Sequence, residues 1–264
     1  MGKYSRIVVF IIIKSLFITT IMPCYSLSVF GNEKFVVNHD YYFEINSDDA
    51  DTVNGSFNYI KADRPNTRLL VPGIASLAII TFLVDEPVVD FARTNQTSFL
   101  KSVAHYTDAG GEKKIVVPGV LLTYVAARFL LKDERLKNTT LNSIQSVIVT
   151  AIATEGIKYL AGRARPFNYE GAYSFQPFPG GLDRYKSLPS GHTSLAFALF
   201  TPYAETYSRW IYLVPVSVAF GRVYQDKHWL SDVVAGGGIG IISGILFTHH
   251  ENIQIIPNGL RIYF

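Results

Sequence analysis

The sequence is poor in charge and in cysteine, and both shortages exclude classes of protein. Charged residues make up 17% of the 264 residues, whereas hydrophobic residues make up 48%. Disordered chains combine low hydrophobicity with high charge, so a disordered protein is excluded. A single cysteine allows neither a disulfide framework nor a cysteine-based zinc site. The chain is long enough for one large folded domain or two small ones.

A surplus of basic residues is also missing, although the formal net charge is +3. Lys3, Arg6 and Lys14 lie within residues 1–26, where no Asp or Glu occurs. The rest of the chain carries 21 basic and 21 acidic residues. Because nucleic-acid binding needs cations that replace the counterions of phosphates, we expect no nucleic-acid partner.

Residues 1–26 have the order of a secretory signal peptide. A basic start precedes an apolar run that is broken by Lys14, and small residues end at Ser26, a candidate cleavage position. Lys14 leaves the run short for a membrane span, so we favour a cleaved signal over an uncut anchor. Lipid attachment at Cys24 is the least favoured alternative, because Pro23 precedes it.

Four segments are expected along the chain. They are a signal peptide (1–26), an irregular polar arm that includes short extended pieces (27–68), a helical domain (69–248) and a short tail (249–264). The tail contains Pro257-Asn258-Gly259 between two apolar pieces. This turn signal predicts a small hairpin.

Apolar blocks in the central domain predict six helices. Each block is too long for a typical strand, and the blocks are 69–84, 115–131, 141–157, 193–206, 210–221 and 233–248. A further amphipathic helix is expected within 87–107. The first block would reach only about 24 Å, short of the roughly 30 Å hydrocarbon core of a bilayer. It nevertheless has little polar face, so we favour a membrane-associated bundle over a soluble secreted one.

The first cluster of candidate site residues is Lys158, followed seven residues later by Arg165 and then by Pro166. Seven residues are nearly two helical turns, so both cations would share one face if the helix persists. Proline disfavours a continuing helix, which places Arg165 at the end of that helix. Two cations there suit an oxyanion, although cations at a helix end also complement the helix dipole.

The second cluster is Pro189-Ser190-Gly191-His192, directly before an apolar run. Ser190 is a natural N-cap, and Gly191 lets a ligand approach the backbone closely. Free N–H groups at a helix start bind anions, and His192 would point towards such an anion. The alternative is a capped helix with an incidental histidine.

The third cluster is Arg222, His228 and Asp232. His228 and Asp232 are four residues apart at the start of the last helix, so they would share one face. A carboxylate that accepts from one imidazole nitrogen leaves the lone pair of the other free, which makes His228 a candidate nucleophile or base. The alternative is a partly exposed His–Asp pair without a role.

Taken together, the clusters converge if the bundle runs up and down, because the four helix ends that carry them then lie on one side. The three stretches Lys158–Pro166, Pro189–His192 and Arg222–Asp232 resemble the signature of the type 2 phosphatidic acid phosphatase (PAP2) superfamily, which includes bacterial acid phosphatases and vanadium haloperoxidases. The likeness extends over about 69–248. One departure is Gly221, where the family often has a serine. The resemblance implies an all-α six-helix bundle of PAP2 type.

The same resemblance implies a phosphatase that works through a phosphohistidine intermediate. His228 would attack phosphorus, Asp232 would orient His228, and His192 would protonate the leaving oxygen. Five residues would bind the phosphate oxygens: Lys158, Arg165, Ser190, Gly191 and Arg222. No carboxylate cluster of metal-binding type lies near them in the sequence, so we expect no metal and no other cofactor.

The expected substrate is a phosphorylated lipid or a small phosphate ester. The expected location is the cell membrane, with the site facing the periplasm or exterior. The alternatives are a soluble periplasmic acid phosphatase of broad specificity, a vanadium-dependent haloperoxidase and a non-catalytic membrane protein.

The side of the membrane on which the site lies is a point of conflict. Lys132, Arg135 and Lys137 in the loop 132–140 indicate that this loop is cytoplasmic, which places the three clusters outside. Six full spans after a cleaved signal would place the clusters inside. At least one of three predictions must therefore be wrong: that the signal is cleaved, that there are six spans, or that the helices are fully inserted.

Overall fold

The computed structural model describes residues 34–38, 41–44, 59–61, 67–249, 253–256 and 259–262, so the expected signal segment lies outside the described residues. The described chain is built mainly from eight α-helices, and the prediction of an all-α fold is confirmed. The helices are α2 (Thr67–Phe82), α3 (Asp85–Thr94), α4 (Ser98–Asp108), α5 (Lys113–Val125), α6 (Glu134–Ala161), α7 (Gly191–Thr206), α8 (Leu213–Tyr224) and α9 (Leu230–His249).

Short elements join or extend these helices. The 3₁₀-helices are η2 (Ala109–Gly111), η4 (Pro166–Asn168), η5 (Asp183–Tyr185) and η6 (Arg209–Tyr212), and a π-helical turn, η3 (Ala126–Leu131), continues α5. Strands β1 (Lys34–Asn38), β2 (Tyr41–Glu44) and β3 (Tyr59–Lys61) form an antiparallel sheet in the order β1-β2-β3. Strands β4 (Ile253–Ile256) and β5 (Gly259–Ile262) pair antiparallel, which is the hairpin expected in the tail.

Five of the six predicted blocks fall within helical elements and the sixth, 69–84, extends two residues beyond the end of α2, but the number of helices was underestimated. The region 87–107, where one amphipathic helix was expected, contains parts of two helices, α3 and α4. The break has a local cause, because Thr97 has extended backbone angles and its side chain accepts a hydrogen bond from the N–H of Leu100. Thr97 is therefore an N-cap that starts a new helix.

The predicted block 141–157 is also too short, because α6 spans 28 residues. Its N-terminus is capped by Asp133, whose side chain accepts from the N–H of Leu136. Hydroxyl side chains face the interior along α6, and two of them bind α7: Thr140 lies 2.9 Å from the Tyr203 hydroxyl, and Ser143 donates to the carbonyl of Leu199. Apolar periodicity misses a helix whose buried face is polar.

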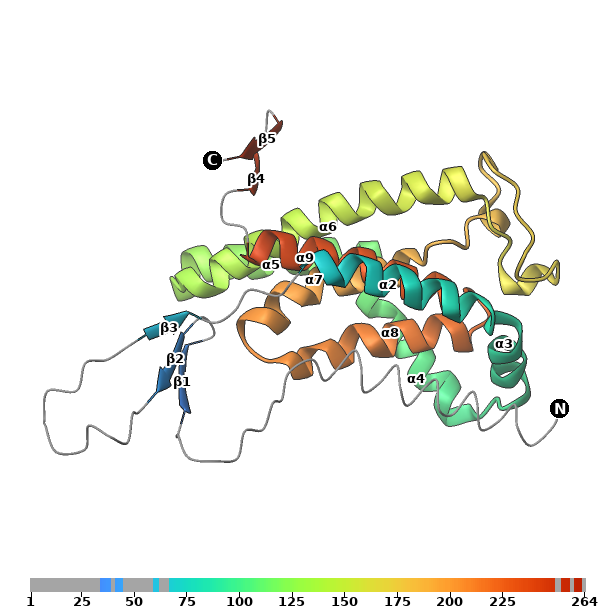
Figure 1. Cartoon of the computed structure of the whole chain (residues 1–264), viewed down its shortest axis with the longest axis horizontal. Helices are drawn as coiled ribbons and strands as arrows, with labels where there is room; N and C mark the ends of the chain where they lie inside the picture. Colours follow the sequence, from blue (N-terminus) through green and yellow to red (C-terminus); the bar gives the residue numbers. More distant parts are fainter. Residues whose placement is uncertain are drawn as a thin grey trace, which may run out of the picture.

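Helix α9 lies at the centre of the bundle and contacts α7, α2, α6 and α8. Its approach to α7 is close at Gly236, where an added Cβ would lie 2.6 Å from the Ser190 carbonyl oxygen. Any larger residue at Gly236 would therefore push α9 away from the start of α7. Figure 1 shows α6 along one side of this core and α8 with α4 along the other.

The C-terminal ends of α6 and α8 lie at the same end of the bundle as the N-terminal ends of α7 and α9, on the side of α3 (right in Figure 1). Contacts between distant segments fix this end. The N–H of Ser190 donates to the carbonyl of Asp232 at 2.9 Å, and Arg165 Nη1 donates to the carbonyl of Lys227 at 3.4 Å. The up-and-down arrangement thus brings the three sequence clusters to one end, as predicted.

Among the residues that the structure describes, two helical segments are long and apolar enough to cross a membrane, Lys113–Leu131 and Leu230–His249. The pair α2–α3 passes the same test as one span but bends by 62°. The outer face of α5–η3 is apolar and exposed: Leu122 is 68% exposed, and Leu130 is 78% exposed. A soluble monomer rarely exposes a continuous apolar face of this kind, so the described helices form a membrane-type bundle.

We expect the full-length chain to remain in the membrane pellet after extraction with alkaline carbonate. Leu122→Lys should reduce the inserted fraction strongly, because a lysine at the centre of a span costs about 2.5 to 3.5 kcal/mol. In a soluble bundle the same exposed substitution would change stability by only about 0.5 kcal/mol. Lys101→Glu on exposed α4 serves as the control. Recovery of the wild type in the supernatant would contradict the membrane assignment.

Candidate active site

The first cluster lies where α6 ends, and its geometry differs from the prediction. Helix α6 stops at Ala161, and Gly162 has a positive φ of 59°. A Cβ at Gly162 would lie 1.7 Å from the Gln176 carbonyl oxygen, so only glycine fits this turn. Lys158 and Arg165 therefore do not share a helix face. Lys158 lies in the last turn of α6, and Arg165 lies in the extended segment that follows.

Lys158 is buried at this end of the bundle. Its Nζ donates to the carbonyl of Lys186 at 2.6 Å, and its Cε lies 3.6 Å from the position that a Cβ on Gly191 would occupy. Burial, reinforced by the charge of Arg165, lowers the pKa of Lys158 to about 8. Lys158 is therefore still a cation at neutral pH, next to the start of α7.

Arg165 and Arg222 are buried, and each binds one carboxylate. Arg165 Nη2 donates to Asp183 Oδ1 at 2.9 Å, and Arg222 Nη1 donates to Asp108 Oδ1 at 2.6 Å. Arg222 Nε is buried and has no hydrogen-bond partner among the described residues. A buried donor without an acceptor is costly unless a ligand supplies one, so this N–H indicates where an oxyanion could bind.

The second cluster is the N-terminus of α7, as predicted. Ser190 occupies the N-cap position, but its hydroxyl lies 2.9 Å from the Thr193 hydroxyl and makes no capping hydrogen bond to the backbone. His192 Nε2 lies 3.2 Å from Glu112 Oε2. Burial and the charge of Arg222 lower the pKa of His192, which Asp108 and Glu112 partly offset.

The third cluster departs from the predicted His–Asp pair. His228 lies in the loop before α9 rather than on the helix, and its Nδ1 is 3.7 Å from Asp232 Oδ2, too far for a hydrogen bond. Nδ1 instead lies 2.8 Å from the Ser187 carbonyl oxygen. A carbonyl only accepts, so Nδ1 carries the proton and the lone pair of Nε2 is free.

Burial holds the pKa of His228 well below its ordinary value, and the charges of Lys158 and Arg165 act in the same direction against Asp232. His228 is thus neutral at neutral pH. The Asp232 carboxylate nevertheless supports this loop, since Oδ2 accepts from the Trp229 N–H at 2.9 Å. One imidazole nitrogen thus keeps a free lone pair, as expected, although the Ser187 carbonyl rather than Asp232 binds the other nitrogen.

Four residues of this end were not identified from the sequence. Ser187 supplies the carbonyl that holds His228, and Arg163 donates to Asp232 at 2.7 Å. Asp108, the last residue of α4, binds Arg222, and Glu112, directly before α5, binds His192. Arg163 could have been noticed, because it lies in the same short basic segment as Arg165. No sequence signal marks Ser187, whose contribution to His228 is a backbone atom.

The predicted site residues thus lie at one end and influence one another. The charges of Lys158 and Arg165 act on His228, and that of Arg222 acts on both Arg165 and His192. One cluster, the basic centre, therefore contains both histidines together with Lys158, Arg165 and Arg222. Within the part of the chain that the structure describes, no group of three or more His, Cys, Asp or Glu side chains is arranged to hold a metal ion.

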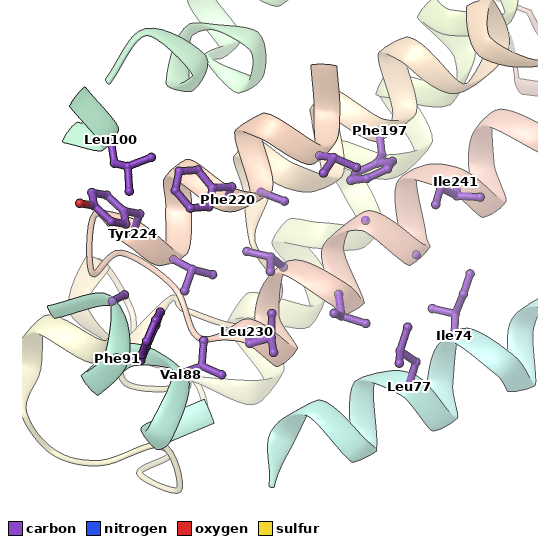
Figure 2. A pocket seen from close by; sticks show the side chains of 18 of the residues that line it. Ile74, Leu77, Val88, Phe91, Leu100, Phe197, Phe220, Tyr224, Leu230 and Ile241 are labelled. Carbon is purple, nitrogen blue, oxygen red and sulfur yellow. The ribbon is translucent and has the colours of Figure 1, made fainter. Parts of the chain in front are cut away.

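An apolar pocket of about 340 Å³ lies on another face of the same helices, between α2, α3, α8 and α9 (Figure 2). Its walls include Leu77, Phe91, Phe197, Phe220, Leu230 and Ile241. Val223, directly after Arg222, also lines it. The apolar pocket and the basic centre therefore share the end of α8 and the start of α9 as walls.

Comparison with known proteins agrees with this geometry. The PAP2 superfamily matches residues 139–254, which include all three clusters. A lipid A 1-phosphatase from Rhizobium etli is 30% identical over 205 residues, which are 70% of this chain and 87% of that protein. The chain belongs to the PAP2 superfamily. This confirms the resemblance and the enzyme class that it implied, a phosphatase.

Two further proteins show how far this PAP2 chain resembles known ones. An undecaprenyl-diphosphatase from Sulfolobus acidocaldarius is 26% identical over 151 residues, which are 55% of this chain and 68% of that protein. The crystal structure of Aquifex aeolicus LpxE has a TM-score of 0.51 and 18% identity, and the match covers 63% of this chain and 95% of that one. The latter likeness establishes the fold.

The lowered pKa of Lys158 predicts how phosphate affinity depends on pH. Lys158 is protonated below pH 8 and loses its charge above it, so the inhibition constant of inorganic phosphate should rise towards tenfold per unit above pH 8. Inorganic phosphate is mainly a dianion throughout that range and adds no slope of its own. The measurement is competitive inhibition between pH 7 and 9.5.

Lys158→Arg should remove this slope, because a guanidinium keeps its charge. Lys101→Arg, on the exposed face of α4, is the matched control and should keep it. An equal slope in Lys158→Arg would show that another group titrates and that Lys158 does not bind the anion.

Proposed function

We propose that this PAP2 phosphatase hydrolyses a lipid phosphate or diphosphate at the outer side of the membrane, through a phosphohistidine on His228. The observation that carries the proposal is the state of His228: it is buried and neutral, and the Ser187 carbonyl fixes its free lone pair on Nε2. A neutral imidazole surrounded by cations is suited to attack a phosphate whose charge those cations bind.

In the first step His228 Nε2 forms a bond to phosphorus while the bond from phosphorus to the leaving oxygen breaks. His192 supplies the proton that the leaving oxygen takes up. In the second step a water oxygen attacks phosphorus, His192 accepts its proton, and the bond between phosphorus and Nε2 breaks to release phosphate. Two histidines of different roles thus complete the cycle.

Charge stabilisation in both steps falls to the basic centre. Lys158, Arg165 and Arg222 would bind the phosphate oxygens, together with the Ser190 hydroxyl and the Gly191 N–H at the positive end of the α7 dipole. The unpartnered Nε of Arg222 supports this role. Phosphate would also replace the carboxylates that hold the two arginines in the free enzyme.

Three features support an amphiphilic substrate over a small soluble ester. The outer face of α5–η3 is apolar and exposed, so the basic centre lies at the end of a membrane-type bundle. The apolar pocket shares the end of α8 and the start of α9 with this centre, and it runs from Leu230 to Ile241, about 17 Å along α9. Two relatives act, by name, on lipid A and undecaprenyl diphosphate.

The proposed side of the membrane rests on the loop between η3 and α6. Helix α6 begins at Glu134 and carries Lys158 in its last turn, so this loop and the basic centre lie at opposite ends of one long helix. Lys132, Arg135 and Lys137 surround the loop, and basic short loops remain cytoplasmic. The basic centre would then face the periplasm or exterior.

Substitution of the nucleophile tests the mechanism. His228→Ala should abolish both turnover and the acid-labile phosphoenzyme that rapid quenching traps from a radiolabelled lipid phosphate. His105→Ala, which removes an exposed histidine of α4, is the control and should leave both intact. Turnover that persists in folded His228→Ala would exclude a phosphohistidine at this residue.

Filling the apolar pocket tests the lipid substrate. Ala219→Phe narrows the pocket and should lower kcat/KM for a long-chain lipid phosphate by about tenfold, as expected if roughly two methylene groups lose their burial. A short-chain, water-soluble phosphate should be unaffected. Val214→Phe, on the same helix but outside the pocket, is the control. An equal loss for both substrates would show that the pocket does not receive the substrate chain.

A further inference from the structure

Arg163 is fully buried beside the catalytic centre, and its guanidinium makes five hydrogen bonds to protein groups. Nη1 donates to Asp232 Oδ1 and to Ser231 Oγ, each at 2.7 Å. Nη2 donates to Asp85 Oδ2 at 2.7 Å and to the Ala172 carbonyl at 2.8 Å, and Nε donates to the same carbonyl at 2.9 Å. All three nitrogens are thus used within the protein, whereas the Nε of Arg222 has no partner among the described residues.

Asp85 is the second anchor of this guanidinium. It is the first residue of α3 and is fully buried. Its Oδ1 accepts from the Ser231 N–H at 2.8 Å, and Oδ2 accepts from the Ser231 hydroxyl at 2.5 Å. The Phe82 ring lies 4.3 Å from Arg163 Cζ and covers the cluster. The cluster of Asp85, Arg163 and Asp232 therefore joins α3, the segment after α6 and the start of α9.

Two routes lead from Arg163 to His228. The Arg163 carbonyl accepts from the Ser187 N–H at 3.0 Å, and the Ser187 carbonyl holds His228 Nδ1 at 2.8 Å. The Arg163 side chain holds Asp232, whose Oδ2 accepts from the Ser187 hydroxyl at 2.5 Å. Both routes end at the residue that selects the tautomer of His228.

We infer that Arg163 is a positioning residue: by bridging Asp85 and Asp232, it fixes the carboxylate and the Ser187 segment that orient His228. The inference rests on the proposed function, in which His228 is the nucleophile. Stability is a weak explanation for the cluster, since well-packed apolar residues often stabilise a core as well as buried ion pairs do. Partners that orient a reacting group, in contrast, change activity by about 10- to 100-fold when removed.

Charge balance allows the role in orientation to be separated from the role in folding. Arg163→Met leaves two buried carboxylates uncompensated and should lower Tm strongly. Arg163→Met combined with Asp85→Asn leaves only Asp232 charged, which restores the net charge of the wild-type cluster. We expect the double variant to recover most of the lost Tm, while kcat stays about 10- to 100-fold below wild type.

Inorganic phosphate provides the second readout. Arg163 does not face the phosphate site. The inhibition constant of inorganic phosphate and the KM of the substrate should therefore stay within about twofold of wild type in the double variant. If the double variant does not fold, two single variants replace it, Arg163→Lys and Asp85→Asn. Each keeps a charge balance close to that of the wild type, and each should show a lower kcat with an unchanged phosphate inhibition constant. Arg135→Met, at the opposite end of α6, is the control and should leave kcat unchanged.

Two results would overturn the inference. Recovery of both Tm and kcat in the double variant, or unchanged kcat in folded Arg163→Lys and Asp85→Asn, would show that the cluster serves folding alone. A rise in the phosphate inhibition constant that matches the fall in kcat would make Arg163 a phosphate ligand. Failure of the proposed function is seen separately, as turnover or phosphoenzyme in His228→Ala.

Discussion

The end of the bundle that carries the proposed active site depends on one buried interaction, the guanidinium of Arg163 between the carboxylates of Asp85 and Asp232. Two buried carboxylates this close together would be very costly without the guanidinium between them, because removing even a single ion from water costs several kcal/mol. The charges are compensated only when α3, the segment after α6 and the start of α9 meet. The electrostatic penalty for separating them therefore acts as a constraint on the geometry that surrounds His228.

A second group of charges is arranged for exchange rather than for permanence. Arg165, Arg222 and His192 belong to the proposed phosphate site, and each lies against a carboxylate, of which Asp183 and Glu112 are exposed. The two guanidinium groups repel one another when no anion is present. Exposed carboxylates reduce that repulsion at low cost and leave easily, whereas the buried carboxylates around Arg163 cannot be replaced by phosphate.

The sequence predicted that the three clusters lie at one end of the bundle but underestimated the number of helices, and the reason lies in how each signal arises. Spacing and helix-end chemistry mark Lys158, the start of α7 and His228, because these features are local. Arg163 was missed because its role depends on distant residues: its guanidinium binds Asp85 and Asp232, which lie 78 and 69 residues away in the sequence. Ser187 acts through its carbonyl, and any residue type provides one. The buried face of α6 is polar, so the sequence shows no apolar periodicity that would reveal the full length of this helix.

The position of the site at a bundle end also follows from these charges. The cations of the basic centre outnumber the buried carboxylates that could compensate them and need water or a ligand, whereas the face of α5–η3 exposes leucine and phenylalanine and needs hydrocarbon. Both requirements are met only where the bundle leaves the membrane. A substrate with a phosphate head and an apolar chain has the same two requirements. A lipid phosphate can therefore satisfy the basic centre and the apolar pocket without leaving the bilayer, which a small soluble ester cannot do.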